Sequence, residues 1–121
     1  MLDYIYITLA RNPTKLKPAE IIDSWKGLLH GLKMTQHTVT GHDMTIRRED
    51  NEVDCFSSIS LLHYLPNETG HDTWTVRGFY DHHLNKTANG WKVDKMKLIV
   101  TVIEGNIDIP RLAQLKAKAI R

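Results

Sequence analysis

The chain has 121 residues, of which 41% are hydrophobic and 25% are charged, and its formal net charge is +2. This length fits one domain and is enough to bury a hydrophobic core without disulfide or metal cross-links. The small net charge does not indicate a nucleic-acid-binding protein. No apolar run approaches the ~20 residues needed to cross a bilayer. We therefore expect residues 1–121 to form a single domain, with neither nucleic acid nor membrane as a partner.

Cys55 is the one cysteine of the chain, so no intrachain disulfide can form. Such cysteine usage is typical of proteins in a reducing compartment. The first residues also lack the basic leader of a signal peptide, because an acid, Asp3, stands among them. We expect a cytoplasmic protein, in which Cys55 is a buried structural thiol rather than a nucleophile.

The first elements expected along the chain are a strand and a helix. Residues 2–9 are rich in β-branched and aromatic side chains, which predicts a short strand broken by Arg11-Asn12-Pro13. Residues 18–30 then place apolar side chains at helical spacing, with Pro18 at the favoured first position. The apolar stripe of this helix comprises Ile21, Ile22, Trp25, Leu28, Leu29 and Leu32.

Four long strand-like segments follow, at about residues 35–47, 52–64, 73–87 and 90–104. Their short connections predict an antiparallel meander, and Asn89-Gly90 is typical of a hairpin because both residues tolerate positive φ. Strands of this length twist and curl.

A last helix is expected from about Pro110, with Leu112, Leu115 and Ala119 on one side. The predicted fold class is thus α+β. A strongly curved antiparallel sheet forms a cone-like pocket, and the helix at residues 18–30 packs in it.

Strand parity selects two of the seven histidines as site candidates. Alternate residues from Val53 to His63 form one mostly apolar face, and His63 stands at its end. If the strands at 35–47 and 52–64 pair around residue 50, opposed residues have numbers that sum to about 100, so His37 faces His63. Two adjacent imidazoles on an inner face can act as general acid and base. The alternative for His63 is a core histidine bonded to the backbone.

Other polar residues are weaker candidates. Neighbours in Asp81-His82-His83 point to opposite faces of a strand, so the run could supply one group to the pocket or belong to a solvated face. Tyr4 could polarise a carbonyl or be an ordinary aromatic of the sheet. We expect no metal site, because the sequence has neither a cysteine pair nor a helical His-x-x-x-His.

Several runs resemble the SnoaL-like branch of the nuclear-transport-factor-2-like superfamily. They are Leu2-Asp3-Tyr4, Ala19-Glu20-Ile21-Ile22 with Trp25, Thr35-Gln36-His37, Arg77-Gly78-Phe79-Tyr80-Asp81 and Asn89-Gly90-Trp91-Lys92-Val93. The resemblance covers residues 2–106 in order. Within the superfamily the pattern is most similar to that of scytalone dehydratase, whose Asp-Tyr, Thr-Gln-His and second histidine match Tyr4, His37 and His63.

The resemblance implies a cofactor-independent lyase or isomerase, of the dehydratase or polyketide cyclase type, acting on an aromatic or alicyclic ketone. His37 and His63 would transfer the proton, and Tyr4 would position a water on the substrate carbonyl. The substrate-binding residues expected for the hydrophobic small-molecule ligand are Trp25, Phe79 and Asp81.

The resemblance implies a long helix with a catalytic acid before the strand that holds Tyr4, and we expect the domain to be N-terminally incomplete relative to the family. Family analogy also implies a homodimer that forms through the sheet face. Two alternatives to an enzyme stay open. One is a non-catalytic ligand-binding or dimerisation domain, and the other is an accessory subunit of a ring-hydroxylating oxygenase.

Overall fold

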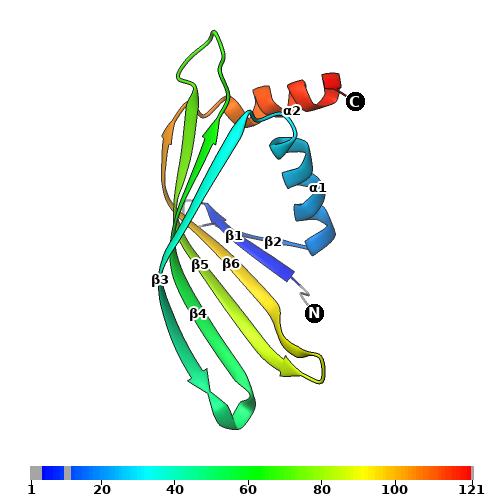
Figure 1. Cartoon of the computed structure of the whole chain (residues 1–121), viewed down its shortest axis with the longest axis vertical. Helices are drawn as coiled ribbons and strands as arrows, with labels where there is room; N and C mark the ends of the chain where they lie inside the picture. Colours follow the sequence, from blue (N-terminus) through cyan, green and yellow to red (C-terminus); the bar gives the residue numbers. More distant parts are fainter. Residues whose placement is uncertain (1–3, 10–11, 121) are drawn as a thin grey trace.

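The computed structural model describes residues 4–9 and 12–120, so Leu2 and Asp3 of the first predicted strand lie outside the described residues. A six-stranded sheet carries two α-helices (Figure 1). The strands are β1 (Tyr4–Leu9), β2 (Asn12–Leu16), β3 (Met34–Arg47), β4 (Glu52–Tyr64), β5 (Thr73–Thr87) and β6 (Gly90–Gly105). The helices are α1 (Pro18–Leu29) and α2 (Ile109–Ile120), with a 3-10 turn, η1 (Arg48–Asp50), between β3 and β4.

The strand order is β2-β1-β6-β5-β4-β3, which confirms the predicted α+β class and its antiparallel meander from β3 to β6. Two features of the sheet were not predicted. The first strand, β1, pairs in parallel with β6, and β2 pairs antiparallel with β1. Pro13 falls inside β2, where we expected a break. An edge strand tolerates proline because one side of its backbone needs no ladder partner.

The helices lie together on one side of the upper part of the sheet, and the lower ends of β3 to β6 extend beyond them (Figure 1). The predicted placement of α1 inside the curve is only partly right, because α1 packs mainly against α2. Ile21 is buried, whereas Ile22 is 49% exposed. The predicted apolar side of α2 was wrong. Its buried residues are Ile109, Ala113 and Ala117, and small alanines let the two helices approach closely.

The core consists of two apolar clusters. One lies on the inner face of the sheet and comprises Ile59, Leu61, Val76 and Leu98. The other comprises Leu65, Ile109 and Ala113 and lies between the end of β4 and α2. Each fully buried aliphatic side chain of this kind stabilises a fold by about 1.5–3 kcal/mol. The burial of alternate residues along β4 confirms the inner face predicted from Val53 to His63.

A β-bulge in β3 sets the register of the hairpin β3–β4. In the pairs from Arg47↔Glu52 to Asp43↔Phe56, each residue of β3 is offset by one position from the partner that the sequence predicts. The pairing shifts by one further residue between Thr40 and Asp43. At this point two residues of β3, Gly41 and His42, lie opposite a single residue of β4, Ser57. Gly41 has φ of +63°, a conformation that suits glycine because it has no Cβ.

The hairpin β5–β6 lies where Asn89-Gly90 predicts it, with a different turn. Thr87 pairs with Gly90, so Ala88 and Asn89 form the turn. Only Gly90 takes positive φ, at +97°. The Thr87 hydroxyl donates to the Gly90 carbonyl at 2.7 Å and accepts from the Asn89 N–H at 3.2 Å.

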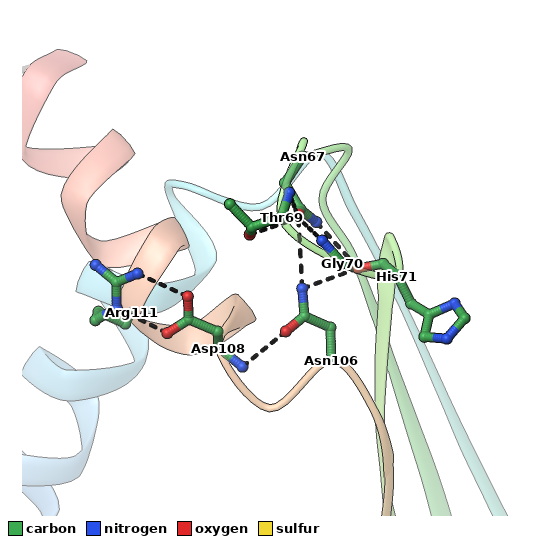
Figure 2. A network of polar contacts seen from close by, with 7 residues as sticks. All are labelled: Asn67, Thr69, Gly70, His71, Asn106, Asp108 and Arg111. Atoms are coloured by element: carbon green, nitrogen blue, oxygen red, sulfur yellow. Dashed lines mark hydrogen bonds and ion pairs between the residues drawn. The ribbon is translucent and has the colours of Figure 1, made fainter.

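The loop between β4 and β5 is closed by Asn67 (Figure 2). Its amide nitrogen donates to the carbonyls of Leu65 and His71, at 3.0 Å each. Its amide oxygen accepts from the Thr69 and Gly70 N–H groups at 3.0 Å, from the Thr69 hydroxyl at 3.1 Å and from the Asn106 amide at 3.4 Å. One side chain thus joins both ends of the loop and the segment before α2.

Asn106 and Asp108 continue this network to the start of α2 (Figure 2). The Asn106 amide nitrogen donates to the His71 carbonyl at 3.0 Å, and its oxygen accepts from the Asp108 N–H at 3.0 Å. The Asp108 carboxylate in turn accepts two hydrogen bonds from Arg111, at 2.7 and 2.6 Å. The Arg111 guanidinium lowers the pKa of Asp108.

We predict that Asn67→Ala lowers the free energy of unfolding by about 1–3 kcal/mol, because it leaves several donors and acceptors of the loop without partners. The measurement is urea unfolding followed by circular dichroism. Glu68→Ala is the matched control, since Glu68 is exposed in the same loop and makes no described side-chain contact. Equal unfolding midpoints for the two variants would contradict this role of Asn67.

Candidate functional site

His63 lies at the end of the buried face of β4 and is 5% exposed. It stands opposite Trp74 of β5, and the two rings are in contact, with centroids 4.3 Å apart. Its Nδ1 lies 3.0 Å from the Trp74 carbonyl oxygen. A carbonyl can only accept, so Nδ1 must carry the proton of the neutral ring. The lone pair of neutral His63 is therefore on Nε2.

His37 is the second imidazole of this end of the sheet. The prediction that it directly faces His63 was wrong, because His37 pairs with Leu61 and His63 pairs with Thr35. The shift amounts to two residues, which keeps both histidines on the inner face. They are diagonal neighbours, with ring centroids 5.5 Å apart and an angle of 71° between the planes. His37 is exposed, because β3 is an edge strand.

Burial lowers the pKa of both imidazoles. For His63 the loss of hydration is the largest cause, the hydrogen bond to the Trp74 carbonyl opposes it, and the charge of a protonated His37 lowers the pKa further. For His37 burial alone lowers the pKa. Both rings are thus held towards the neutral form near pH 7, and a neutral imidazole with a free nitrogen is a competent general base.

The side chain of Tyr4 lies outside the part of the chain that is described, and no described contact brings Trp25 to this histidine pair. The backbone of Tyr4 pairs with Lys95 of β6. Trp74, which contacts His63, instead faces Gly105, and Gly105 is at the other end of β6. Trp25 lies on α1 and is partly buried.

Phe79 and Asp81 lie on the outer face of the sheet, opposite to His63. Both residues alternate with inner-face positions of β5, since Tyr80 pairs with Ser57 on the inner face. Phe79 stacks on Phe56, with ring centroids 4.9 Å apart. The expectation that these two side chains line the same pocket as the histidines does not hold, because neighbouring strand residues point to opposite faces.

The inner face carries a cavity of about 540 Å³ at its other end, and neither His37 nor His63 lines it. The expectation that the histidine pair points into an enclosed pocket is therefore not met at this cavity, which is open to solvent on one side. Sequence analysis missed the cavity because its walls come from four strands whose register it could not place. The lining residues are Met44, Ile46, Val53, Cys55, His82, Leu84, Trp91 and Val93.

A cluster of three polar side chains lies beside this cavity. The His42 Nδ1 is 2.7 Å from the Ser57 hydroxyl oxygen and 3.9 Å from the Cys55 sulfur. Ser57 is 2% exposed, whereas Cys55 is only partly buried. The predicted buried structural thiol is thus a partly exposed one on a cavity wall. His42 was missed because its inward direction depends on the bulge.

The Asp81-His82-His83 run divides between the faces as expected. His82 lines the cavity, and burial lowers its pKa while the Asp81 charge opposes this. His83 lies on the outer face, where its Nδ1 is 2.5 Å from the Asp94 carboxylate and its Nε2 is 3.5 Å from that of Glu52. Asp94 also accepts from the Asn85 amide at 2.6 Å.

The curved antiparallel sheet with two helices on one side defines a small α+β domain, with the histidine pair on the inner face of the sheet. The chain belongs to the SnoaL-like domain family, whose model matches residues 2–97. The predicted superfamily is thereby confirmed. A search of curated proteins finds no match.

Several solved structures are similar. Kfla4162 from Kribbella flavida is 26% identical, with a TM-score of 0.72 over 90% of this chain and 76% of that one. A type 2 hexachlorocyclohexane dehydrochlorinase, LinA, is 16% identical, with a TM-score of 0.64 over 86% and 69%. A candidate scytalone dehydratase from Novosphingobium aromaticivorans is 16% identical, with a TM-score of 0.65 over 84% and 66%.

Among residues 4–9 and 12–120, no helix is both long and apolar enough to cross a membrane. In the same part of the chain, no three side chains of histidine, cysteine, aspartate or glutamate converge as metal ligands.

We predict that His63 titrates below 6.5 and has a proton on Nδ1 in its neutral form. Because the pKa is lowered by folding, the unfolded chain binds more protons between the two pKa values. Stability from this group is therefore complete above about pH 6.5 and is lost as the pH falls towards the lower folded pKa. Nitrogen-resolved NMR titration reports the tautomer and the pKa. A neutral ring protonated on Nε2 would contradict the assignment.

The linked stability is checked by measuring the free energy of unfolding between pH 5 and 8 for the wild type and His63→Gln. The variant is expected to lose the part of the pH dependence that comes from His63. Parallel curves for the two proteins would contradict the link.

Proposed function

We propose that this protein is a cofactor-independent lyase or isomerase that acts on an aromatic or alicyclic ketone by histidine-mediated proton transfer. The proposal rests on the tautomer, the orientation and the neutral form of the His63 imidazole. Its Nδ1 is occupied by the Trp74 carbonyl, so Nε2 is a base of fixed orientation. Burial keeps this base neutral near pH 7.

In the dehydratase version of the reaction the substrate is a β-hydroxy ketone. His63 Nε2 takes the proton from the carbon between the carbonyl and the carbinol, which leaves an enolate. The C–O bond then breaks, the electron pair of the enolate forms the new C=C bond, and the hydroxyl leaves as water. A proton returned by an imidazolium completes that water, so no external oxidant or reductant is needed.

His37 is proposed as the partner that returns or relays this proton. Its ring edge contacts His63, and its exposure on β3 leaves it open to a ligand. The proposed role of Tyr4 in polarising the carbonyl and of Trp25 as an apolar wall for the hydrophobic ligand rests on the family resemblance alone. A cytoplasmic location likewise stays a prediction, which rests on the cysteine content.

The family supports this proposal at the level of the fold, since similar structures include a dehydrochlorinase and a candidate scytalone dehydratase. A second candidate function is a non-catalytic ligand-binding domain. The solvent exposure of His37 favours this second function, because proton transfer is most efficient in a site that excludes water. Binding of a ketone without turnover would identify this second function.

We also propose a homodimer that forms through the outer face of the sheet. Phe56 is 39% exposed there and stacks on Phe79. Around them lies a hollow lined by hydroxyl groups, among them those of Thr38, Ser58 and Thr101. An exposed aromatic pair with a polar rim is typical of the centre of a protein interface.

We predict that His63→Ala lowers kcat/KM about 10²–10⁴-fold on a cyclic β-hydroxy ketone fused to an aromatic ring, since this is the usual contribution of a positioned acid or base. His37→Ala is expected to reduce the rate by a similar or smaller factor. The measurement is the ultraviolet absorbance of the conjugated product across a panel of such ketones.

His71→Ala is the matched control, because His71 is an exposed histidine of the β4–β5 loop whose described bonds use its backbone carbonyl. It should keep wild-type activity. Full turnover by both His63→Ala and His37→Ala would overturn the mechanism.

We predict that Phe56→Lys converts the proposed dimer to a monomer, because it places a charge in the centre of the interface. Trp91→Lys is the control, since Trp91 is a 47% exposed aromatic on the inner face. Size-exclusion chromatography with light scattering measures the mass of each. A monomeric wild type at micromolar concentration, or a dimeric Phe56→Lys, would show that this face is not the interface.

A further inference from the structure

A row of soft donor atoms crosses the inner face at the end remote from His63. Met44 pairs with Cys55, Cys55 pairs with His82, and His82 pairs with Met96. Directly opposed side chains on one face have Cβ atoms about 4.5–5.5 Å apart. A thioether, a thiol, an imidazole and a second thioether thus stand side by side on four adjacent strands.

Three of these donors share the wall of the apolar cavity, namely Met44, Cys55 and His82. The Nδ1 of a further imidazole, that of His42 in the bulge of β3, lies 2.7 Å from the Ser57 hydroxyl oxygen and 3.9 Å from the Cys55 sulfur. Cys55 therefore lies at the centre of the group, with a donor on each side along the row and another beside it. None of the three cavity-lining donors is needed for the core cluster of the sheet.

The kind of metal follows from the donor types. Zinc in proteins takes four ligands drawn from cysteine, histidine and carboxylate side chains. Among the described residues no three such side chains converge, so this row does not offer the set of donors that zinc usually takes. A site in this row must use the Met44 thioether, and thioether and thiolate ligands select soft ions such as Cu(I).

We propose that Cys55, Met44 and His82 form a binding site for a soft monovalent metal ion, Cu(I) or Ag(I). Cys55 binds as the thiolate, so each bound ion releases one proton. Met44 and His82 supply the flanking sulfur and nitrogen. The other walls of the cavity, among them Trp91 and Val93, are apolar.

The test is an anaerobic titration of the reduced protein with Cu(I), in competition with a chromophoric Cu(I) chelator. We expect the wild type to bind one equivalent. Cys55→Ser should abolish this binding, and Met44→Leu and His82→Gln should each weaken it at least ~10-fold. Circular dichroism of each variant checks folding, and the 55% exposure of Met44 makes Met44→Leu a mild change.

Two methionine variants serve as matched controls. Met34→Leu changes a 52% exposed methionine at the other end of the same strand, opposite Tyr64. Met96→Leu changes the far end of the row, which is separated from Cys55 by the whole strand β5. Both should bind Cu(I) as the wild type does. If Met44→Leu also binds like the wild type, the ion is held by a thiol alone and the proposed site is overturned. Equal binding by Cys55→Ser would overturn it as well.

Discussion

The extra residue in β3 at Gly41–His42 decides which side chains this strand presents to the inner face. Below the bulge the even-numbered residues Met44 and Ile46 point inward, and above it the odd-numbered His37 does so. The η1 connection alone would place His37 on the outer face, because it shifts the pairing by one residue. The bulge adds a second shift and restores the face. Both candidate sites therefore depend on a glycine that can take positive φ.

His63 depends in turn on the loop that follows β4. The Trp74 carbonyl fixes the His63 ring, and Trp74 is the second residue of β5, directly after the loop. Asn67 closes this loop, and the Leu65 N–H donates to the Asp72 carbonyl at 2.8 Å. The hydrogen bonds of an exposed loop thus hold the acceptor that selects the tautomer of a buried imidazole. The position of that acceptor fixes which nitrogen of His63 carries the lone pair.

Periodicity allowed most of the fold to be predicted, because long strands and an amphipathic helix repeat a signal many times. The bounds of β4 and β5 and the start of α1 agree with the structure. The parts that could not be predicted depend on single residues or on distant pairing. Three features produce no periodic pattern in the sequence: the αL conformation of Gly41, the edge position that tolerates Pro13, and the parallel pairing of β1 with β6. The inner-face position of His63 could be predicted because it follows from the periodicity of β4. The position of His37 beside it depends on the η1 connection and the bulge, and the cavity depends on the register of four strands.

The two ends of the inner face have different chemistry, and the residues between them keep them apart. His63 and His37 offer nitrogen donors next to Trp74, whereas the Cys55 row offers sulfur beside an apolar cavity. Ile59 and Leu61 lie between them on β4 and are buried. A soft ion at Cys55 would therefore leave the His63 lone pair free. One curved face can hold a proton-transfer pair and a soft-donor group because the strands are long enough to separate them by several apolar rows.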